Sequence, residues 1–131
     1  MKTLKTHKEI GDYGERIAAR YLLLRGYAIK ERNWRTGHME VDLIAANLAD
    51  VAFVEVKTRS YTSKEWEMLP PPKRAVDGEK QRLIRLAAQK YMRAHPSGKQ
   101  PRMDVIEVSL LKKEDAPKYK VVKVHHIKAA F

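Results

Sequence analysis

The stretch Phe53-Val54-Glu55-Val56-Lys57 decides the fold, because its alternation of apolar and charged residues predicts a β-strand. Residues two apart on a strand share a face, so Glu55 and Lys57 lie on one face, while the other carries Ala52, Val54 and Val56 into a core. Phenylalanine and valine around the charges are typical of a strand at the centre of a covered sheet, where a charge needs a reason. The stretch therefore predicts a central strand that holds a carboxylate beside an ammonium.

A second acidic segment, residues 40–44, repeats this alternation, with Glu40 and Asp42 on one face and valine and leucine on the other. If the two strands are neighbours, Asp42 and Glu55 supply the oxygen ligands that Mg²⁺ or Mn²⁺ prefers. Lys57 is then placed to orient an attacking water or to pair with a phosphate. The alternative is that such pairs are solvated faces or cross-strand ion pairs of a half-exposed strand.

Two helices flank these strands in the predicted order, and each carries a further candidate residue. The first, residues 10–24, includes Glu15 close to Gly11 and Gly14, two glycines that a close packing partner would explain. Glu15 is a third candidate site residue, or simply a glutamate that favours the positive end of its helix. The second helix, residues 76–93, carries Lys80 on its apolar stripe, where it either contacts phosphate or extends along the edge of the stripe.

The remaining segments predict an α-β-β-β-α-β-β chain with a central mixed five-stranded sheet flanked by helices, an α/β fold. Gly26 and Asp77 are the expected end of the first helix and cap of the second. Residues 35–37 are expected to form a turn, and residues 60–72, with three consecutive prolines, a long loop. The predicted strands are residues 27–34, 39–46, 51–58, 102–110 and 118–127, the first three forming an antiparallel meander.

Composition limits the class of protein. A chain of 131 residues with 44% hydrophobic content can bury one core, so we expect a single domain over residues 1–131. We expect no membrane span or signal peptide, and a cytoplasmic location that suits the absence of cysteine. The five histidines have no metal-binding spacing, and we expect them at the surface.

Net charge is +11, from 27 Lys and Arg against 16 Asp and Glu. Such an excess attracts polyanions, nucleic acid above all, although a basic surface that only keeps the protein soluble remains the alternative. No glycine-rich phosphate loop is present.

Several segments together resemble the YraN-like family of small bacterial proteins, also known as UPF0102. They are Gly11-x-x-Gly14-Glu15, Asn33-Trp34-Arg35, residues 40–45, residues 53–59, Lys80 and residues 102–105. Met39 and Val41 depart from the glycine and isoleucine usual in that family. The resemblance implies a restriction-endonuclease-like fold, similar to archaeal Holliday-junction resolvases, and a magnesium-dependent nuclease site of Glu15, Asp42, Glu55 and Lys57. Glu15, Asp42 and Glu55 are then the metal ligands.

These observations favour a metal-dependent DNA endonuclease, possibly acting on branched or junction DNA, for which a homodimer would allow symmetric cutting. We expect Arg35, Arg59 and Lys80 to contact the nucleic acid. The alternatives are a non-catalytic nucleic-acid-binding protein that keeps the fold, and a structural or ribosome-associated basic protein.

Overall fold

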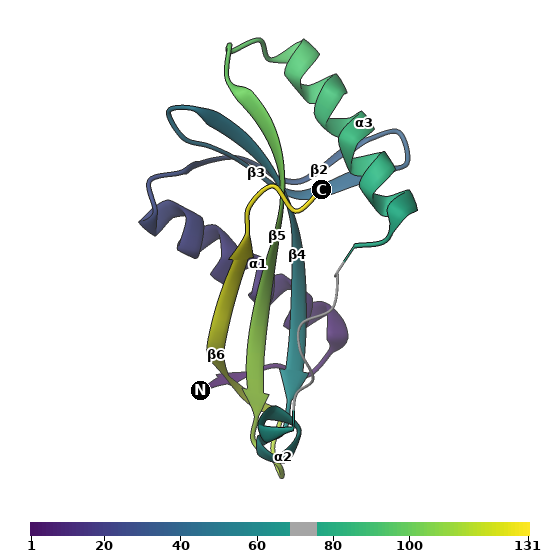
Figure 1. Ribbon diagram of the computed structural model, residues 1–131. Helices are drawn as coiled ribbons and strands as arrows, with labels where there is room; N and C mark the ends of the chain where they lie inside the picture. The colour runs from purple at the N-terminus through teal and green to yellow at the C-terminus, as the bar shows by residue number, and fades with distance from the viewer. Residues whose placement is uncertain (69–75) are drawn as a thin grey trace.

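The computed structural model describes residues 1–68 and 76–131, which form a mixed six-stranded sheet with helices against it (Figure 1). The strands lie in the order β1-β6-β5-β4-β3-β2, so β4 is central. In chain order the elements are β1 (Lys2–Thr3), α1 (His7–Leu24), β2 (Ala28–Thr36), β3 (Met39–Ala46), β4 (Asp50–Tyr61), α2 (Ser63–Glu67), α3 (Gly78–Ala94), β5 (Gln100–Lys112) and β6 (Lys118–Ile127).

Strands β2, β3 and β4 form the expected antiparallel meander, which makes the two acidic strands neighbours. In the β3–β4 ladder, Leu43 pairs with Val54 and Ile44 pairs with Phe53. Strand β5 then pairs with β4 in parallel, and β6 returns antiparallel to β5. A parallel pair requires a long crossover, and the segment that carries α2 and α3 supplies it. The expected mixed sheet is confirmed.

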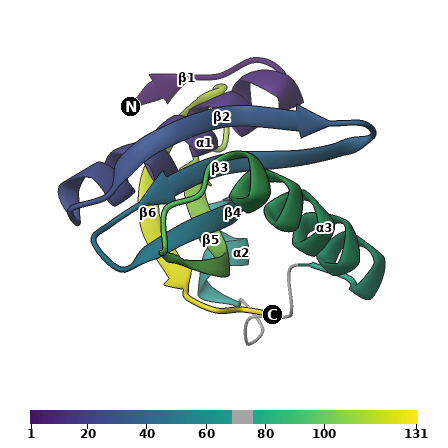
Figure 2. The same cartoon turned by 90° about the horizontal axis from the view of Figure 1, so that it is seen from above.

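Strand β4 is buried on both faces because α1 and α3 cover opposite sides of the sheet (Figure 2). Ala52 and Val54 belong to a core built with α1, whereas Val51 and Phe53 belong to a second core built with α3. The predicted inward packing of Ala52, Val54 and Val56 is therefore confirmed. Glu55 lies on the α3 side of the strand, the side that Phe53 also faces.

The helix ends follow from local hydrogen bonds. The Thr6 hydroxyl accepts the Glu9 N–H, so α1 begins three residues earlier than the apolar pattern suggests. Gly26, at φ 86°, follows its last turn, and Asp77 caps α3 by accepting the Lys80 N–H at 2.9 Å, as predicted. Within the described parts of the chain, no helix is both long and apolar enough to cross a membrane.

Three expectations need correction. The sheet has six strands rather than five, because the two-residue β1 pairs with β6. Arg35 and Thr36 lie in β2 rather than in a turn, since they pair with Glu40 and Met39. The expected loop over 60–72 begins with the end of β4 and with α2, which starts at a Thr62–Glu65 capping box. Its residues 69–72 lie outside the described residues.

Candidate active site

Glu55, in the middle of β4, is the centre of the candidate site. It is 4% exposed, and its Oε1 lies 3.1 Å from Lys80 Nζ and 3.6 Å from Lys57 Nζ. Its other oxygen, Oε2, is buried and has no hydrogen-bond partner within the described residues. A buried acceptor without a partner is costly in a folded protein. Another donor or a cation at Oε2 would satisfy this acceptor.

Asp42 occupies the point where β3 and β4 separate. Their recorded ladder ends at the pair Leu43 and Val54, and beyond it the Asp42 Oδ2 accepts the Val56 N–H at 2.8 Å. The carboxylate thus replaces the backbone acceptor that β3 no longer supplies to β4. Burial, followed by repulsion from Glu55, raises the pKa of Asp42 from 3.8 to about 7. At neutral pH a proton and a cation would therefore compete for this carboxylate.

Glu15 approaches the two strands from α1. The close approach depends on Gly14, where a Cβ would lie 1.7 Å from the Thr58 hydroxyl of β4, so only glycine fits. Burial, and repulsion from nearby carboxylates that include Glu55, raise the pKa of Glu15, whereas a hydrogen bond from Asn33 lowers it. The expected packing partner is thus found for Gly14, while Gly11 has no neighbouring atom within 4 Å.

Asn33 is a site residue that motif reasoning missed. It lies in β2 between Arg32 and Trp34, whose partners Leu43 and Val41 flank Asp42. Its φ of 49° is in the left-handed region, which asparagine tolerates better than most residues, and its side chain interacts with Glu15. In the sequence, the one sign that Asn33 matters was that the Asn33-Trp34-Arg35 segment is among those that carry the family resemblance.

Lys80 reaches the site from the first turn of α3. Burial lowers its pKa, but attraction by Glu55 and Asp42 outweighs burial and leaves that pKa above its usual value. The sequence left open whether Lys80 extends along the edge of its stripe or contacts phosphate, and in the structure it is the closer of two ammonium groups on Glu55.

The other two predicted nucleic-acid contacts lie apart from Glu55. Arg35 is exposed and forms an ion pair with Glu40 at 3.4 Å, and Arg59 is exposed near the end of β4. Nothing in their geometry tests a contact with nucleic acid, so their role stays a prediction.

The carboxylates of the site could supply some, but not all, of the ligands of Mg²⁺ or Mn²⁺. Across residues 1–68 and 76–131, no three acidic or histidine side chains are grouped closely enough to enclose a metal ion. Magnesium does not need such a cage, because it commonly binds one or two carboxylates together with waters and substrate phosphate oxygens. Asp42 and the unpartnered Oε2 of Glu55 fit that pattern. Glu15 affects both through its charge, and its role as a third ligand stays a prediction.

A second buried acidic centre lies on β5. Asp104, fully buried, accepts hydrogen bonds from Arg102, from His126 Nε2 at 2.7 Å and from the Ala129 N–H at 3.0 Å. Arg102 also donates to Asp50 and Tyr27. The expectation that all histidines are at the surface is therefore wrong for His126, whose side chain is 2% exposed. The reason is that β6 carries it against β5, where a buried carboxylate needs donors.

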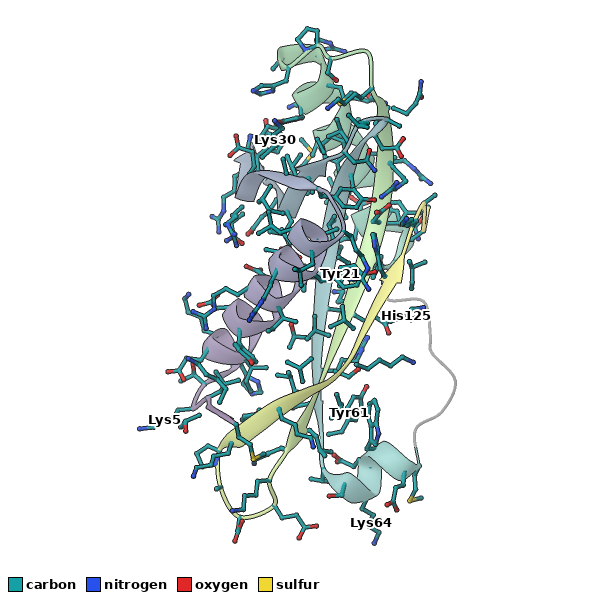
Figure 3. All side chains as sticks on the ribbon, turned by 90° about the vertical axis from the view of Figure 1, so that its left-hand side faces the viewer. Lys5, Tyr21, Lys30, Tyr61, Lys64 and His125 are labelled. Atoms are coloured by element: carbon teal, nitrogen blue, oxygen red, sulfur yellow. The ribbon has the colours of Figure 1, made fainter. Side chains whose placement is uncertain are left out.

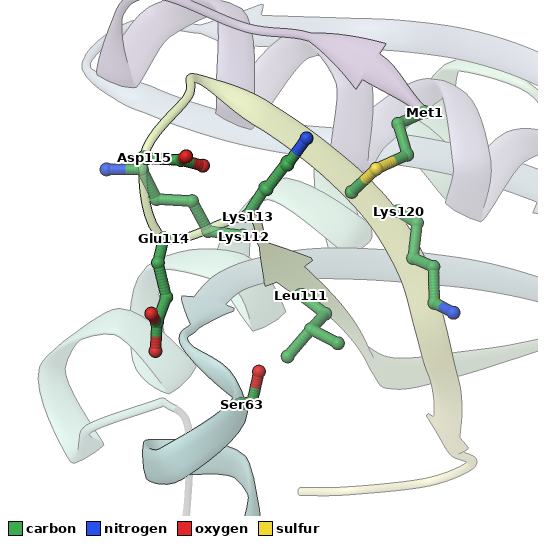
Figure 4. A pocket seen from close by; sticks show the side chains of 8 residues that line it. All are labelled: Met1, Ser63, Leu111, Lys112, Lys113, Glu114, Asp115 and Lys120. Atoms are coloured by element: carbon green, nitrogen blue, oxygen red, sulfur yellow. The ribbon is translucent and has the colours of Figure 1, made fainter.

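A hollow of about 480 Å³ lies where β5 turns into β6, beside α2 (Figure 4). Its lining residues are Met1, Ser63, Leu111, Lys112, Lys113, Glu114, Asp115 and Lys120. Leu111 is six residues along β5 from Val105, the partner of Glu55, which is roughly 20 Å at about 3.3 Å per residue. The hollow is therefore separate from the candidate site.

These features define a mixed α/β protein in which a buried glutamate on the central strand lies beside a half-buried aspartate and two lysines. The chain belongs to the family described as Uncharacterised protein family UPF0102, whose family model matches residues 14–108. A UPF0102 protein of Caldanaerobacter subterraneus is 42% identical over 125 residues, 95% of each chain. A UPF0102 protein of Bacteroides thetaiotaomicron is 41% identical over 78% of this chain and 80% of its own length. One of Frankia alni is 36% identical over 98% of each.

Proposed function

We propose that this protein is a metal-dependent DNA endonuclease with a restriction-endonuclease-like fold, which hydrolyses phosphodiester bonds at the Asp42–Glu55 site. The observation that carries the proposal is the Glu55 side chain, buried at the centre of the sheet with one oxygen unpartnered within the described chain and Asp42 beside it. Structural burial of this kind destabilises a fold, so a functional reason for keeping it is favoured. The likeness of the motifs to Holliday-junction resolvases supports the same reaction.

The residues of the site divide the work by their chemistry. A bound Mg²⁺ would supply an activated water and offset charge on the phosphate oxygens. Asp42 and Glu55 would hold it, with Glu15 adding negative charge from α1. Lys57, on the same face as Glu55, would donate its N–H to a non-bridging phosphate oxygen or orient the attacking water. Attack by the water oxygen would form a new bond to phosphorus while the bond from phosphorus to the leaving ester oxygen breaks. The water would lose a proton to solvent, and the leaving oxygen would take one up from solvent.

DNA as the partner is supported by charge. The net charge of +11 is spread over the molecule, with exposed lysines such as Lys5, Lys30 and Lys64 at different places (Figure 3). A dispersed basic surface attracts the phosphate backbone without reading bases. Binding should then weaken steeply with salt, and a flat plot of log affinity against log salt concentration would contradict this part of the proposal.

The proposal is tested by incubating the protein with labelled linear, flap and four-way-junction DNA at varied Mg²⁺ or Mn²⁺. We expect cleavage that depends on the metal and is lost in Asp42→Asn and Glu55→Gln. Lys57→Ala should keep metal affinity and lose turnover by roughly a hundredfold to a thousandfold. Asp115→Asn, an exposed acid far from the site, is the matched control.

Binding of DNA without cleavage under any metal would overturn the nuclease proposal. The non-catalytic nucleic-acid-binding protein would then be the better account, with Glu55 held by its two lysines as a structural element. Symmetric cutting of a junction would in addition call for two copies of the chain, which the ratio of products from the two strands would report.

A further inference from the structure

The side chain of Lys80 pairs with one oxygen of Glu55, and a metal ion would bind the other. Its ammonium lies 3.1 Å from Glu55 Oε1, closer than that of Lys57 at 3.6 Å. An ammonium and a divalent cation repel each other, and a carboxylate oxygen that engages a metal has less charge to offer a lysine. The two cations therefore compete for the same carboxylate.

Lys80 is the lysine that can leave. Its side chain is 45% exposed, against 33% for Lys57, and it comes from a helix rather than from the strand that carries Glu55. Its backbone is fixed, because the Lys80 N–H donates to the Asp77 cap at 2.9 Å. The long flexible stem can thus swing while the start of α3 stays in place.

We propose that Lys80 is a positioning residue that exchanges partners, holding Glu55 when the site has no metal and turning to a DNA phosphate when a divalent cation binds. This rests on the proposed function. In the metal-free site Lys80 offsets the charge of Glu55 and Asp42, which otherwise repel each other. After the exchange, the partly exposed ammonium of Lys80 pairs with a DNA phosphate, whose negative charge takes the place of that of Glu55.

The exchange couples the two ligands. A cation at Oε2 of Glu55 would repel the Lys80 ammonium at Oε1 and draw charge from the carboxylate they share, so Lys80 weakens metal affinity in the absence of DNA. The freed ammonium then adds a phosphate contact, so metal strengthens DNA binding, and DNA strengthens metal binding by the same factor. A lysine that only stabilises the fold would also repel the metal, but it would not couple metal binding to DNA binding.

The test measures Mg²⁺ affinity by calorimetry at pH 8.5, above the pKa of Asp42 of about 7, for wild type, Lys80→Met and Lys90→Met. Lys90 is exposed on the same helix and has no ion pair among the described residues, so it controls for the loss of one charge. We expect Lys80→Met to bind Mg²⁺ about fivefold tighter or more without DNA, and Lys90→Met to bind as wild type does.

A second measurement uses DNA affinity by fluorescence anisotropy with EDTA or with Ca²⁺ on a labelled duplex. Wild type and Lys90→Met should gain affinity with Ca²⁺, and Lys80→Met should gain less. In wild type, the side-chain Cε resonance of Lys80 should shift on adding Mg²⁺ while that of Lys90 stays, a readout that needs no variant to fold.

The outcomes separate the two proposals. Wild type that binds no divalent cation at pH 8.5 overturns the nuclease function and this inference with it. Wild type that binds Mg²⁺, with Lys80→Met no tighter and the Lys80 resonance unmoved, overturns only the exchange and leaves Lys80 a static ion-pair partner of Glu55.

Discussion

The two buried acidic centres of this protein lie on adjacent strands and are built in opposite ways. On β5, burial raises the pKa of Asp104, but hydrogen bonds from His126, Arg102 and the Ala129 N–H outweigh it and hold that pKa below its usual value. On the β3–β4 side, burial and Glu55 raise the pKa of Asp42 to about 7, and one oxygen of Glu55 lacks a partner within the described chain. Asp104 is fully buried and Asp42 only half-buried, yet Asp42 is the one whose pKa is raised.

The difference lies in whether the fold itself satisfies the charge. The hydrogen-bond donors of Asp104 are held in place by β5, β6 and the segment after β6. The folded chain therefore stabilises the charge of Asp104 without any added ligand. Asp42 and Glu55 receive one backbone N–H and two lysines, but Oε2 of Glu55 has no donor within the described residues, which leaves an oxygen that an added cation could use. A carboxylate whose oxygens all have hydrogen-bond donors supports the fold, whereas a carboxylate with a free oxygen can still bind a cation.

The largest expected effect is on the satisfied centre. Asp104→Asn turns one acceptor oxygen into an NH2 donor and removes the charge that pairs with Arg102, so the free energy of unfolding should fall by about 3–5 kcal/mol. Urea unfolding at pH 7 measures this, with the exposed Asp115→Asn as control. A loss below about 1 kcal/mol would mean that the network contributes little to stability, and the contrast between the centres would fail.

At the Asp42–Glu55 centre, replacing the aspartate is expected to raise the free energy of unfolding. The folded pKa of Asp42, about 7, exceeds its ordinary value of 3.8, so the folded state prefers the protonated form, and stability falls as pH rises between these values. Above about pH 7, Asp42→Asn should stabilise the metal-free protein by up to about 4 kcal/mol, from 1.36 kcal/mol per pH unit.

This stabilisation should disappear near pH 4, where the folded-state carboxyl of wild type is protonated, and metal binding should be lost at every pH. Unfolding curves at pH 4 and pH 8 decide it. If the Asp42→Asn protein were less stable than wild type at pH 8, the main role of the aspartate would be to accept the Val56 N–H. Asp42 would then be a structural carboxylate, as Asp104 is.

The contact that brings Glu15 to the site is expected to have a smaller effect. Gly14→Ala places a methyl group against Thr58 and should cost about 1–3 kcal/mol, whereas Gly11→Ala, with open space around it, should be neutral or stabilise by up to about 1 kcal/mol. Adding Thr58→Ala to Gly14→Ala should restore part of the loss. Equal effects of the two glycine replacements would show that α1 is not held against β4 at this point.

The smallest expected effect is the pH dependence of Mg²⁺ affinity, which tests whether a proton and the metal compete for Asp42. Because a cation needs the ionised Asp42, Mg²⁺ affinity should rise with pH up to about 7 and then level off. Below about pH 7 the change should approach tenfold per pH unit, roughly 1.4 kcal/mol. Calorimetric titrations at several pH values measure it. Affinity that does not vary between about pH 5 and pH 7 would argue that Asp42 is not a ligand.

The sequence predicted the acidic strands and the meander because period-two alternation is local, and residues 39–46 and 118–127 agree with β3 and β6 in full. It missed β1 and α2, which are short and depend on pairing with β6 and on one capping box. It also missed the burial of His126, since nothing near that residue in the sequence shows that Asp104 faces it from the next strand.

The sequence by itself determined which residues alternate, where the two long helices lie, and that Glu55 and Lys57 share a face, because these follow from backbone geometry and short-range hydrogen bonds. Only the tertiary structure decided that Lys80 reaches Glu55, that Asn33 meets Glu15, and that Asp42 replaces a lost acceptor of β4. Those contacts join elements far apart in the chain. Their energies depend on burial and on neighbouring charge, which exist only once the sheet and both covering helices have assembled.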